Sequence, residues 1–149
     1  MTTPLEKPIE LLLVADDPGE IRLIRDAFEQ LSVETQVRVT TDGNDALELL
    51  SRRHDRDSAF VPDLILLYPE LPRMDGFEFL ETIHDDSMLR LVPVLVVTSP
   101  DATMDILESY DLAANACLTR PTTPSEYATM VEAIAKFWFE QAALPPLTS

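Results

Sequence analysis

The fold is decided by residues 61–76, VPDLILLYPELPRMDG. Residues 64–67 form an unbroken apolar run, bounded by Pro62 on one side and by Pro69 on the other. Such a short run without polar alternation is typical of a strand covered on both faces, as in the centre of a parallel sheet. Ligands of open α/β sheets bind just past the carboxyl ends of the strands. Tyr68, at the end of this run, is therefore the first residue of a candidate site.

The rest of the chain alternates between strand and helix patterns. Apolar or alternating runs predict further strands at residues 9–14, 35–41, 91–97 and 114–118. Helical spacing predicts five helices after the strands, with these inward residues: Ile21, Ile24, Phe28 and Leu31; Ala46, Leu47 and Leu50; Phe77, Leu80 and Ile83; Met104, Leu107 and Tyr110; Tyr127, Met130, Val131, Ile134 and Trp138. Five strands alternating with five helices predict a parallel sheet with helices on both faces, but not the strand order.

Length and charge limit the possible functions. A chain of 149 residues fits one domain, and its net charge of −16 argues against binding to nucleic acid or to anionic membranes. There is no apolar stretch long enough for a membrane span and no signal-peptide pattern. Cys117 is the single cysteine, which is consistent with a cytoplasmic location. The acid excess with few lysines is typical of a halophilic protein, although an ordinary acidic cytoplasmic protein is the alternative.

Residues 61–76 resemble the third strand of the receiver domains of two-component response regulators, the CheY-like family. In that family an apolar run is followed by the phospho-accepting aspartate, two residues, and then Leu-Pro-x-Met-Asp-Gly. Residues 71–76 supply the whole motif, and Tyr68 stands where the aspartate belongs. The resemblance covers about residues 9–140, with a short extension at 141–149, within a single receiver-like domain 1–149. It implies a flavodoxin-like doubly wound α/β fold, a (βα)5 three-layer sandwich with strand order 2-1-3-4-5.

Receiver chemistry uses a carboxylate nucleophile, a Mg²⁺ ion held by acids, a hydroxyl and a lysine. The resemblance places Ala15 at the first acid of the family, Asp16 at the second, which is a Mg²⁺ ligand, and Asp17 beside it. For Asp16 and Asp17 the alternative is helix capping. A phenol is neutral at pH 7 and cannot form an acyl phosphate, so Tyr68 and Ala15 together predict weak or absent Mg²⁺ binding. Asp16 remains a weak metal candidate, and Glu70 is either a substitute carboxylate or a solvated turn residue.

Three further positions complete the comparison with the family. Thr98 matches the hydroxyl at the end of the fourth strand. Arg120, before Pro121, replaces the lysine, and we expect it to pair with Asp16 or Asp17 or to stack on Tyr68. Cys117 stands where the family has a tyrosine or phenylalanine that swings inward, and it is either a core filler or a redox residue.

The combined departures at Ala15, Tyr68, Arg120 and Cys117 predict a pseudo-receiver. It would be a non-enzymatic signalling module that acts through protein–protein contact without aspartyl phosphorylation, its partner being a sensor kinase or a downstream protein. One alternative is a phosphorelay receiver that is phosphorylated on Asp16, Asp17 or Glu70. Another is a flavodoxin-like nucleotide or flavin binder, which the acidic turn at residues 16–20 with its single glycine disfavours.

The end of the chain carries the aromatic run Phe137-Trp138-Phe139, followed by Leu144-Pro145-Pro146. It resembles the cyanobacterial-phytochrome response regulators, stand-alone receivers that tend to dimerise through this end. Consecutive helical residues point about 100° apart, so only some of the three rings can face the core. We expect Phe139 to face outward, with Trp138 beside it, at a homodimer interface. The alternative is that the tail packs over the same helix. We expect no output domain after residue 149, which would also favour signalling by protein contact.

Overall fold

The computed structural model describes residues 8–52, 61–72, 74–99, 106–107, 110–111 and 114–141, without the side chains of residues 140 and 141. Its centre is a five-stranded sheet in the order β2-β1-β3-β4-β5, with every neighbouring pair parallel. The strands are β1 Ile9–Val14, β2 Thr35–Thr40, β3 Leu64–Leu67, β4 Val94–Thr98 and β5 Ala116–Thr119. The predicted α/β class and the predicted strand order are confirmed.

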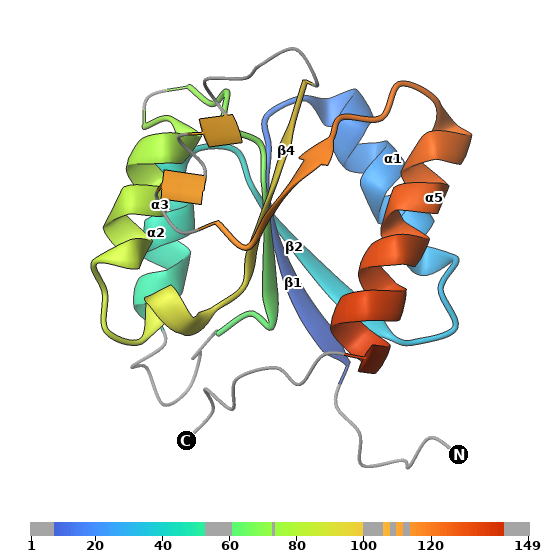
Figure 1. Ribbon diagram of the computed structural model, residues 1–149, viewed down its shortest axis with the longest axis horizontal. Coiled ribbons are helices and arrows are strands. Elements are labelled where there is room, and N and C mark those ends of the chain that lie inside the picture. Colours follow the sequence, from blue (N-terminus) through green and yellow to red (C-terminus); the bar gives the residue numbers. More distant parts are fainter. Residues whose placement is uncertain are drawn as a thin grey trace.

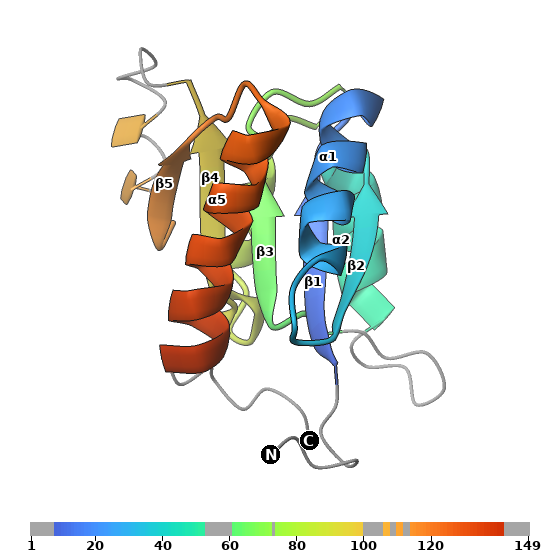
Figure 2. The same cartoon turned by 90° about the vertical axis from the view of Figure 1, so that its right-hand side faces the viewer.

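Helices cover both faces of the sheet, which makes three layers (Figure 1). They are α1 Pro18–Glu29, α2 Gly43–Ser51, α3 Gly76–His84 and α5 Pro124–Ile134, which continues as a π-helical segment at Ala135–Gln141. Helices α2 and α3 lie on one face, and α1 and α5 lie side by side on the other (Figures 1 and 2). None of the helices in the described part of the chain has the length and hydrophobicity to span a bilayer.

A capping side chain marks the start of each of these helices. The side chains of Asp17, Asp42, Asp75 and Thr123 accept hydrogen bonds from backbone N–H groups of the first helical turn. Such caps satisfy amide groups that have no partner within the helix. Asp42 is thus the cap residue of α2.

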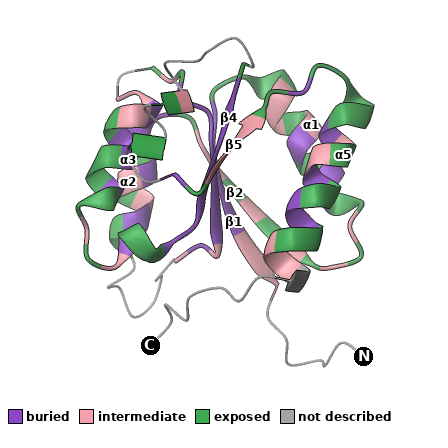
Figure 3. Cartoon of the chain, in the orientation of Figure 1, coloured by how far each residue is buried: buried purple, intermediate pink, exposed green. Residues whose placement is uncertain are grey.

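Buried residues lie on both sides of the sheet (Figure 3). They form two apolar clusters, and β3 contributes to both. Ile65 and Leu67 pack with the α2 and α3 side, whereas Leu64 and Leu66 pack with the α1 and α5 side. All four side chains are fully buried. Because side chains of a strand alternate between faces, Tyr68 continues the Leu64 and Leu66 series and enters the α1/α5 layer.

Several predicted helix faces are confirmed and one is wrong. Ile24 and Phe28 of α1 are buried, and so are Tyr127, Val131 and Ile134 of α5. Leu107 and Tyr110 are instead 59% and 52% exposed. They lie beside β5, which is an edge strand with only half-buried residues at 116–118 and offers little apolar surface to cover them.

The limits of β4 and β5 differ from the prediction. The run at residues 91–97 was assigned to a strand, but Leu89–Leu91 form a 3₁₀ turn and β4 starts at Val94. Pro93 lacks an N–H group and so marks the transition between the two. Strand β5 begins two residues later than predicted, at Ala116. The predictions made for Met104, for an Asp101 cap, for the loop at 54–59 and for the tail at 142–149 lie outside the described residues.

Candidate functional site

A cavity of about 110 Å³ lies at the carboxyl ends of the strands. The loops after β1, β3, β4 and β5 and the first turn of α1 form its walls. It is lined by Ala15, Asp16, Asp17, Glu20, Tyr68, Pro69, Glu70, Val97, Thr98, Ser99 and Arg120. The structure therefore brings together all the candidate site residues of the sequence analysis except Cys117 and the two aromatic residues near the C-terminus.

Tyr68 is held in this cavity by the sheet itself. It follows β3 directly, and its N–H group donates to the carbonyl oxygen of Val14 at 2.9 Å. Only 5% of the residue is exposed, and its hydroxyl makes no hydrogen bond within the described part of the chain. Burial raises the pKa of Tyr68 far above the ordinary value of a phenol, and the nearby Tyr127 hydroxyl and Glu20 carboxylate raise it further. The residue at the acceptor position is thus a neutral ring.

Arg120 makes an ion pair with Glu20 rather than with Asp16 or Asp17. Its Nε donates to Glu20 Oε1 at 2.8 Å, and a terminal N–H group donates to Glu20 Oε2. This bidentate bond raises the pKa of Arg120 above its usual value. The predicted pairing with Asp16 or Asp17 is wrong. Asp17 is engaged as a helix cap, with its Oδ1 2.9 Å from the nitrogen of Gly19, and Asp16 is exposed.

The second contact predicted for Arg120 is present. Its guanidinium carbon lies 5.7 Å from the centroid of the Tyr68 ring, within the range of a cation–π contact. Arg120 therefore covers the ring at the acceptor position while its hydrogen bonds go to Glu20.

Glu20 also binds Tyr127, a residue of α5. The Tyr127 hydroxyl donates to Glu20 Oε1 at 2.6 Å. Burial and this hydrogen bond raise the pKa of Tyr127 to about 12. Neither Glu20 nor Tyr127 was predicted as a site residue, because Glu20 is one of several acids in the turn at residues 16–20 and Tyr127 follows the apolar spacing of its helix. Only the docking of α1 against α5 brings the two together.

The donors around the cavity do not fit a Mg²⁺ site. Ala15 has no side-chain oxygen, Tyr68 is neutral, and the carboxylate of Asp17 serves the helix. No group of three or more His, Cys, Asp or Glu side chains in the described residues is placed to hold a metal ion. Mg²⁺ needs closely placed oxygen ligands in near-ideal octahedral geometry. Asp16 and Glu70, both exposed, do not supply that arrangement.

Thr98 and Cys117 occupy different surroundings. Thr98 is the last residue of β4, is 7% exposed and lines the cavity. Cys117 is half-buried, packs against the core on the α2/α3 side, and lies outside the cavity. Its N–H group donates to the Tyr110 hydroxyl at 3.2 Å. The role of Cys117 as a core filler stays a prediction, which its packing against the core supports.

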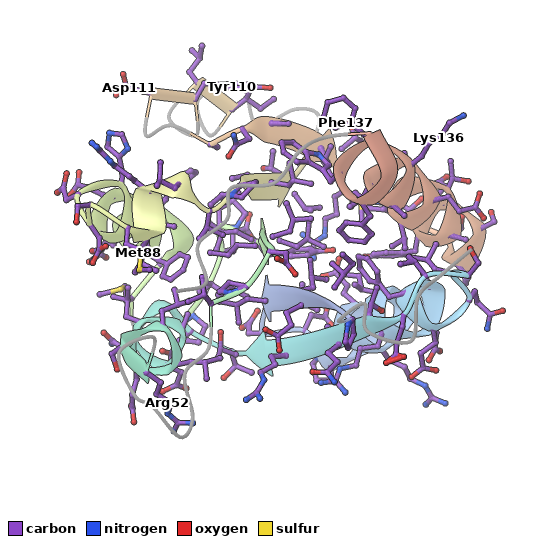
Figure 4. The ribbon with its side chains drawn as sticks, turned by 90° about the horizontal axis from the view of Figure 1, so that it is seen from below. Arg52, Met88, Tyr110, Asp111, Lys136 and Phe137 are labelled. Atoms are coloured by element: carbon purple, nitrogen blue, oxygen red, sulfur yellow. The ribbon has the colours of Figure 1, made fainter. Side chains whose placement is uncertain are left out.

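The aromatic residues near the C-terminus are arranged differently from the prediction. Phe139 is half-buried, and its ring centroid lies 6.4 Å from that of Phe28. Trp138 is also half-buried against the α1/α5 cluster, and its ring makes an edge-on contact with that of Phe137. Phe137 itself is 52% exposed (Figure 4). The prediction assumed α-helical spacing, but residues 135–141 form a π-helix, which advances by a smaller angle per residue.

Comparisons with known proteins agree with the fold and the motif. The family model for the response regulator receiver domain matches residues 11–132. Response regulator Rcp1 of Synechocystis sp. is 30% identical over 145 residues, which cover 97% of this chain and 99% of that protein.

Two solved structures of similar proteins support the same assignment. The phosphorylated cyanobacterial phytochrome response regulator RcpA superposes with a TM-score of 0.86 at 35% identity, over 93% of this chain and 99% of that one. The Mn²⁺-bound form of Rcp1 superposes with a TM-score of 0.83 at 31% identity, again over 93% and 99%. From its fold, its motif and these relatives, the chain belongs to the response regulator receiver domain family of two-component signalling.

Proposed function

We propose that this receiver domain is a pseudo-receiver that signals through protein–protein contact without aspartyl phosphorylation. The observation that carries the proposal is the buried, neutral Tyr68 at the acceptor position, covered by the guanidinium of Arg120. A phenol has no carboxylate with which to form an acyl phosphate. Its raised pKa also keeps it from serving as a phenolate nucleophile near neutral pH.

The positive charge of Arg120 is also already paired with a carboxylate. In receivers a lysine offsets the charge of the phosphoryl group, and here Arg120 in that place is bound by both carboxylate oxygens of Glu20. The exposed carboxylates of Asp16, Asp17 and Glu70 surround the same cavity. A phosphoryl group would therefore meet negative charge at close range with its usual cation already paired.

We propose that Mg²⁺ binding is weak or absent for the same reason. RcpA has been crystallised in a phosphorylated form and Rcp1 in a Mn²⁺-bound form. This chain differs from the family pattern at Ala15 and Tyr68, and Asp16 alone is left as a carboxylate at a ligand position.

The structure gives no support to a nucleotide or flavin binder. The amide of Gly19 at the start of α1 is bonded to Asp17, so a carboxylate occupies the place where a phosphate would bind.

Acetyl phosphate and beryllofluoride, each with Mg²⁺, provide the test. We expect intact-protein mass spectrometry to find no phosphorylated species and ¹⁹F NMR to find no bound beryllofluoride. Tyr68→Asp alone is expected to stay almost unlabelled, because Ala15 and Arg120 remain. The triple variant Ala15→Asp, Tyr68→Asp, Arg120→Lys restores the family residues and is the positive control.

A stoichiometric Mg²⁺-dependent adduct on the wild-type chain would overturn the proposal. Asp16→Asn, Asp17→Asn and Glu70→Gln would then locate it and establish the displaced phosphorelay receiver instead. Robust labelling of the single Tyr68→Asp variant would show that Ala15 and Arg120 are not the obstacles proposed here.

We further propose that the domain acts in the cytoplasm through a protein partner, a sensor kinase or a downstream signalling protein, and not through nucleic acid or membranes. The net charge of −16 supports this, since both alternative surfaces are anionic. The same charge supports a high-salt environment, in which screening would reduce the self-repulsion.

We also propose a homodimer formed through the π-helical end of α5. Phe137 takes the outward position that was predicted for Phe139. The experiment uses a protein concentration of 100 µM, which is about 100-fold above a ~1 µM dissociation constant. Under these conditions we expect sedimentation velocity to show a dimer, and we expect Phe137→Glu to convert it to a monomer. Leu91→Glu, which places the same charge on another exposed apolar residue, is the matched control. A monomeric wild-type protein, or equal loss of the dimer in both variants, would exclude this interface.

A further inference from the structure

Glu20 is a shared hydrogen-bond acceptor in the cavity wall. Its carboxylate accepts two N–H groups of Arg120 and the hydroxyl of Tyr127. The side chain of Glu20 is 14% exposed, so little of this carboxylate can be solvated by water instead. The carboxylate therefore depends on protein donors, because a poorly hydrated charge is costly when it lacks hydrogen bonds.

The hydroxyl of Tyr68 is a hydrogen-bond donor that no described residue accepts. Its hydroxyl oxygen is buried and has no hydrogen-bond partner among the described residues. It nevertheless lies in the same neighbourhood, since Arg120 covers its ring and both Glu20 and Tyr127 influence its ionisation. A buried hydroxyl without a partner is rare in native proteins and costs stability. In this arrangement Arg120 occupies the carboxylate that could satisfy it.

Arg120 differs from its partners in having a route to water. Its side chain is 41% exposed, and it belongs to the loop that joins β5 to α5. A guanidinium that leaves Glu20 can be hydrated at once, whereas Tyr68 and Tyr127, which are 5% and 2% exposed, cannot leave the interior.

We propose that Arg120 and Tyr68 are alternative donors to Glu20, and that the cavity wall switches between an Arg120-bound form and a Tyr68-bound form. In the first form, the one described above, Arg120 is paired and the Tyr68 hydroxyl is unsatisfied. In the second form Arg120 extends into solvent and the Tyr68 hydroxyl donates directly to Glu20 in its place. The exchange lets Arg120 become available at the surface without leaving Glu20 short of a donor.

A double-mutant cycle measured by urea denaturation tests the exchange, because the effect of Tyr68→Phe on stability is expected to differ between the wild-type and the Arg120-substituted backgrounds. In the wild-type background, Tyr68→Phe removes an unsatisfied hydroxyl and is expected to leave the folding equilibrium constant unchanged or to raise it. In an Arg120→Met background the hydroxyl serves Glu20, so Tyr68→Phe is expected to lower the constant by about tenfold or more. Arg120→Ala provides a second background should Arg120→Met not fold.

Tyr110→Phe is the matched control, because Tyr110 lies outside the cavity. Its effect is expected to be the same in each background. Additive effects of Tyr68→Phe and the Arg120 substitutions would overturn the exchange. So would a loss of stability on Tyr68→Phe in the wild-type background, since that would mean that the hydroxyl is already bonded there. The readout is stability, so the result is independent of whether the chain proves to be phosphorylated.

Discussion

Gly76→Ala is expected to lower the free energy of unfolding by about 2–3 kcal/mol. A Cβ atom at this position would lie 2.6 Å from the Cα of Pro69 and 3.0 Å from the carbonyl oxygens of Pro69 and Tyr68. All three atoms belong to the backbone, so no side-chain rotation can relieve the clash. The N–H group of Gly76 also donates to Pro69 at 2.8 Å, which ties the start of α3 to the turn after β3.

Thermal and urea unfolding measure this effect, and a fall in melting temperature of about 5–10 °C is expected for a chain of this size. Gly19→Ala is the matched control, because its nearest neighbour is the side-chain atom Asp17 Oδ1 at 3.3 Å. If Gly76→Ala proved no more destabilising than Gly19→Ala, the backbone contact would not be the constraint that selects glycine in this turn.

Alkaline pH is expected to destabilise the protein steeply through Tyr68 and Tyr127. Both phenols have a pKa in the folded protein above the ordinary value of 10, that of Tyr127 being about 12. A raised pKa contributes stability that is fully present below pH 10 and is lost as pH rises toward the folded value. At pH 12 the loss is about 2–3 kcal/mol for each phenol.

Urea unfolding at intervals between pH 8 and pH 12 measures the slope. Tyr68→Phe and Tyr127→Phe are each expected to remove about half of it, whatever they do to stability at pH 8. Tyr110→Phe removes a phenol that is 52% exposed and is the matched control. An unchanged slope in both buried-phenol variants would contradict the assignment of the raised pKa values to these two residues.

The sequence predicted most of the fold because strands buried on both faces leave a strong pattern. The limits of β1 at residues 9–14 and of β3 at residues 64–67 were predicted to the residue, since neither strand has a polar side to confuse the assignment. The strand order came from the family motif and not from the alternation. Edge strand β5, which is only partly buried, was misplaced by up to two residues.

The site could be predicted only in part, because the apolar periodicity of a helix does not reveal which residues of another helix or loop it contacts. The departures at Ala15, Tyr68 and Arg120 were visible by position, and the cavity brings them together. The partner of Arg120 could not be predicted in this way, since Glu20 reaches it from α1 across 100 positions of sequence. Phe139 was placed outward on α-helical geometry, which fails where the last helix turns into a π-helix.

The Tyr110 hydroxyl accepts a hydrogen bond from the amide of Cys117, and this bond affects how the protein behaves in concentrated solution. Strand β5 is an outer strand, and free amides on such a strand invite the addition of a strand from another molecule. On the opposite margin, Arg25 donates to the carbonyl oxygen of Val37 in β2 at 3.3 Å. Each outermost strand thus has a polar backbone group occupied by a side chain of its own chain, which hinders aggregation by growth of the sheet from either side.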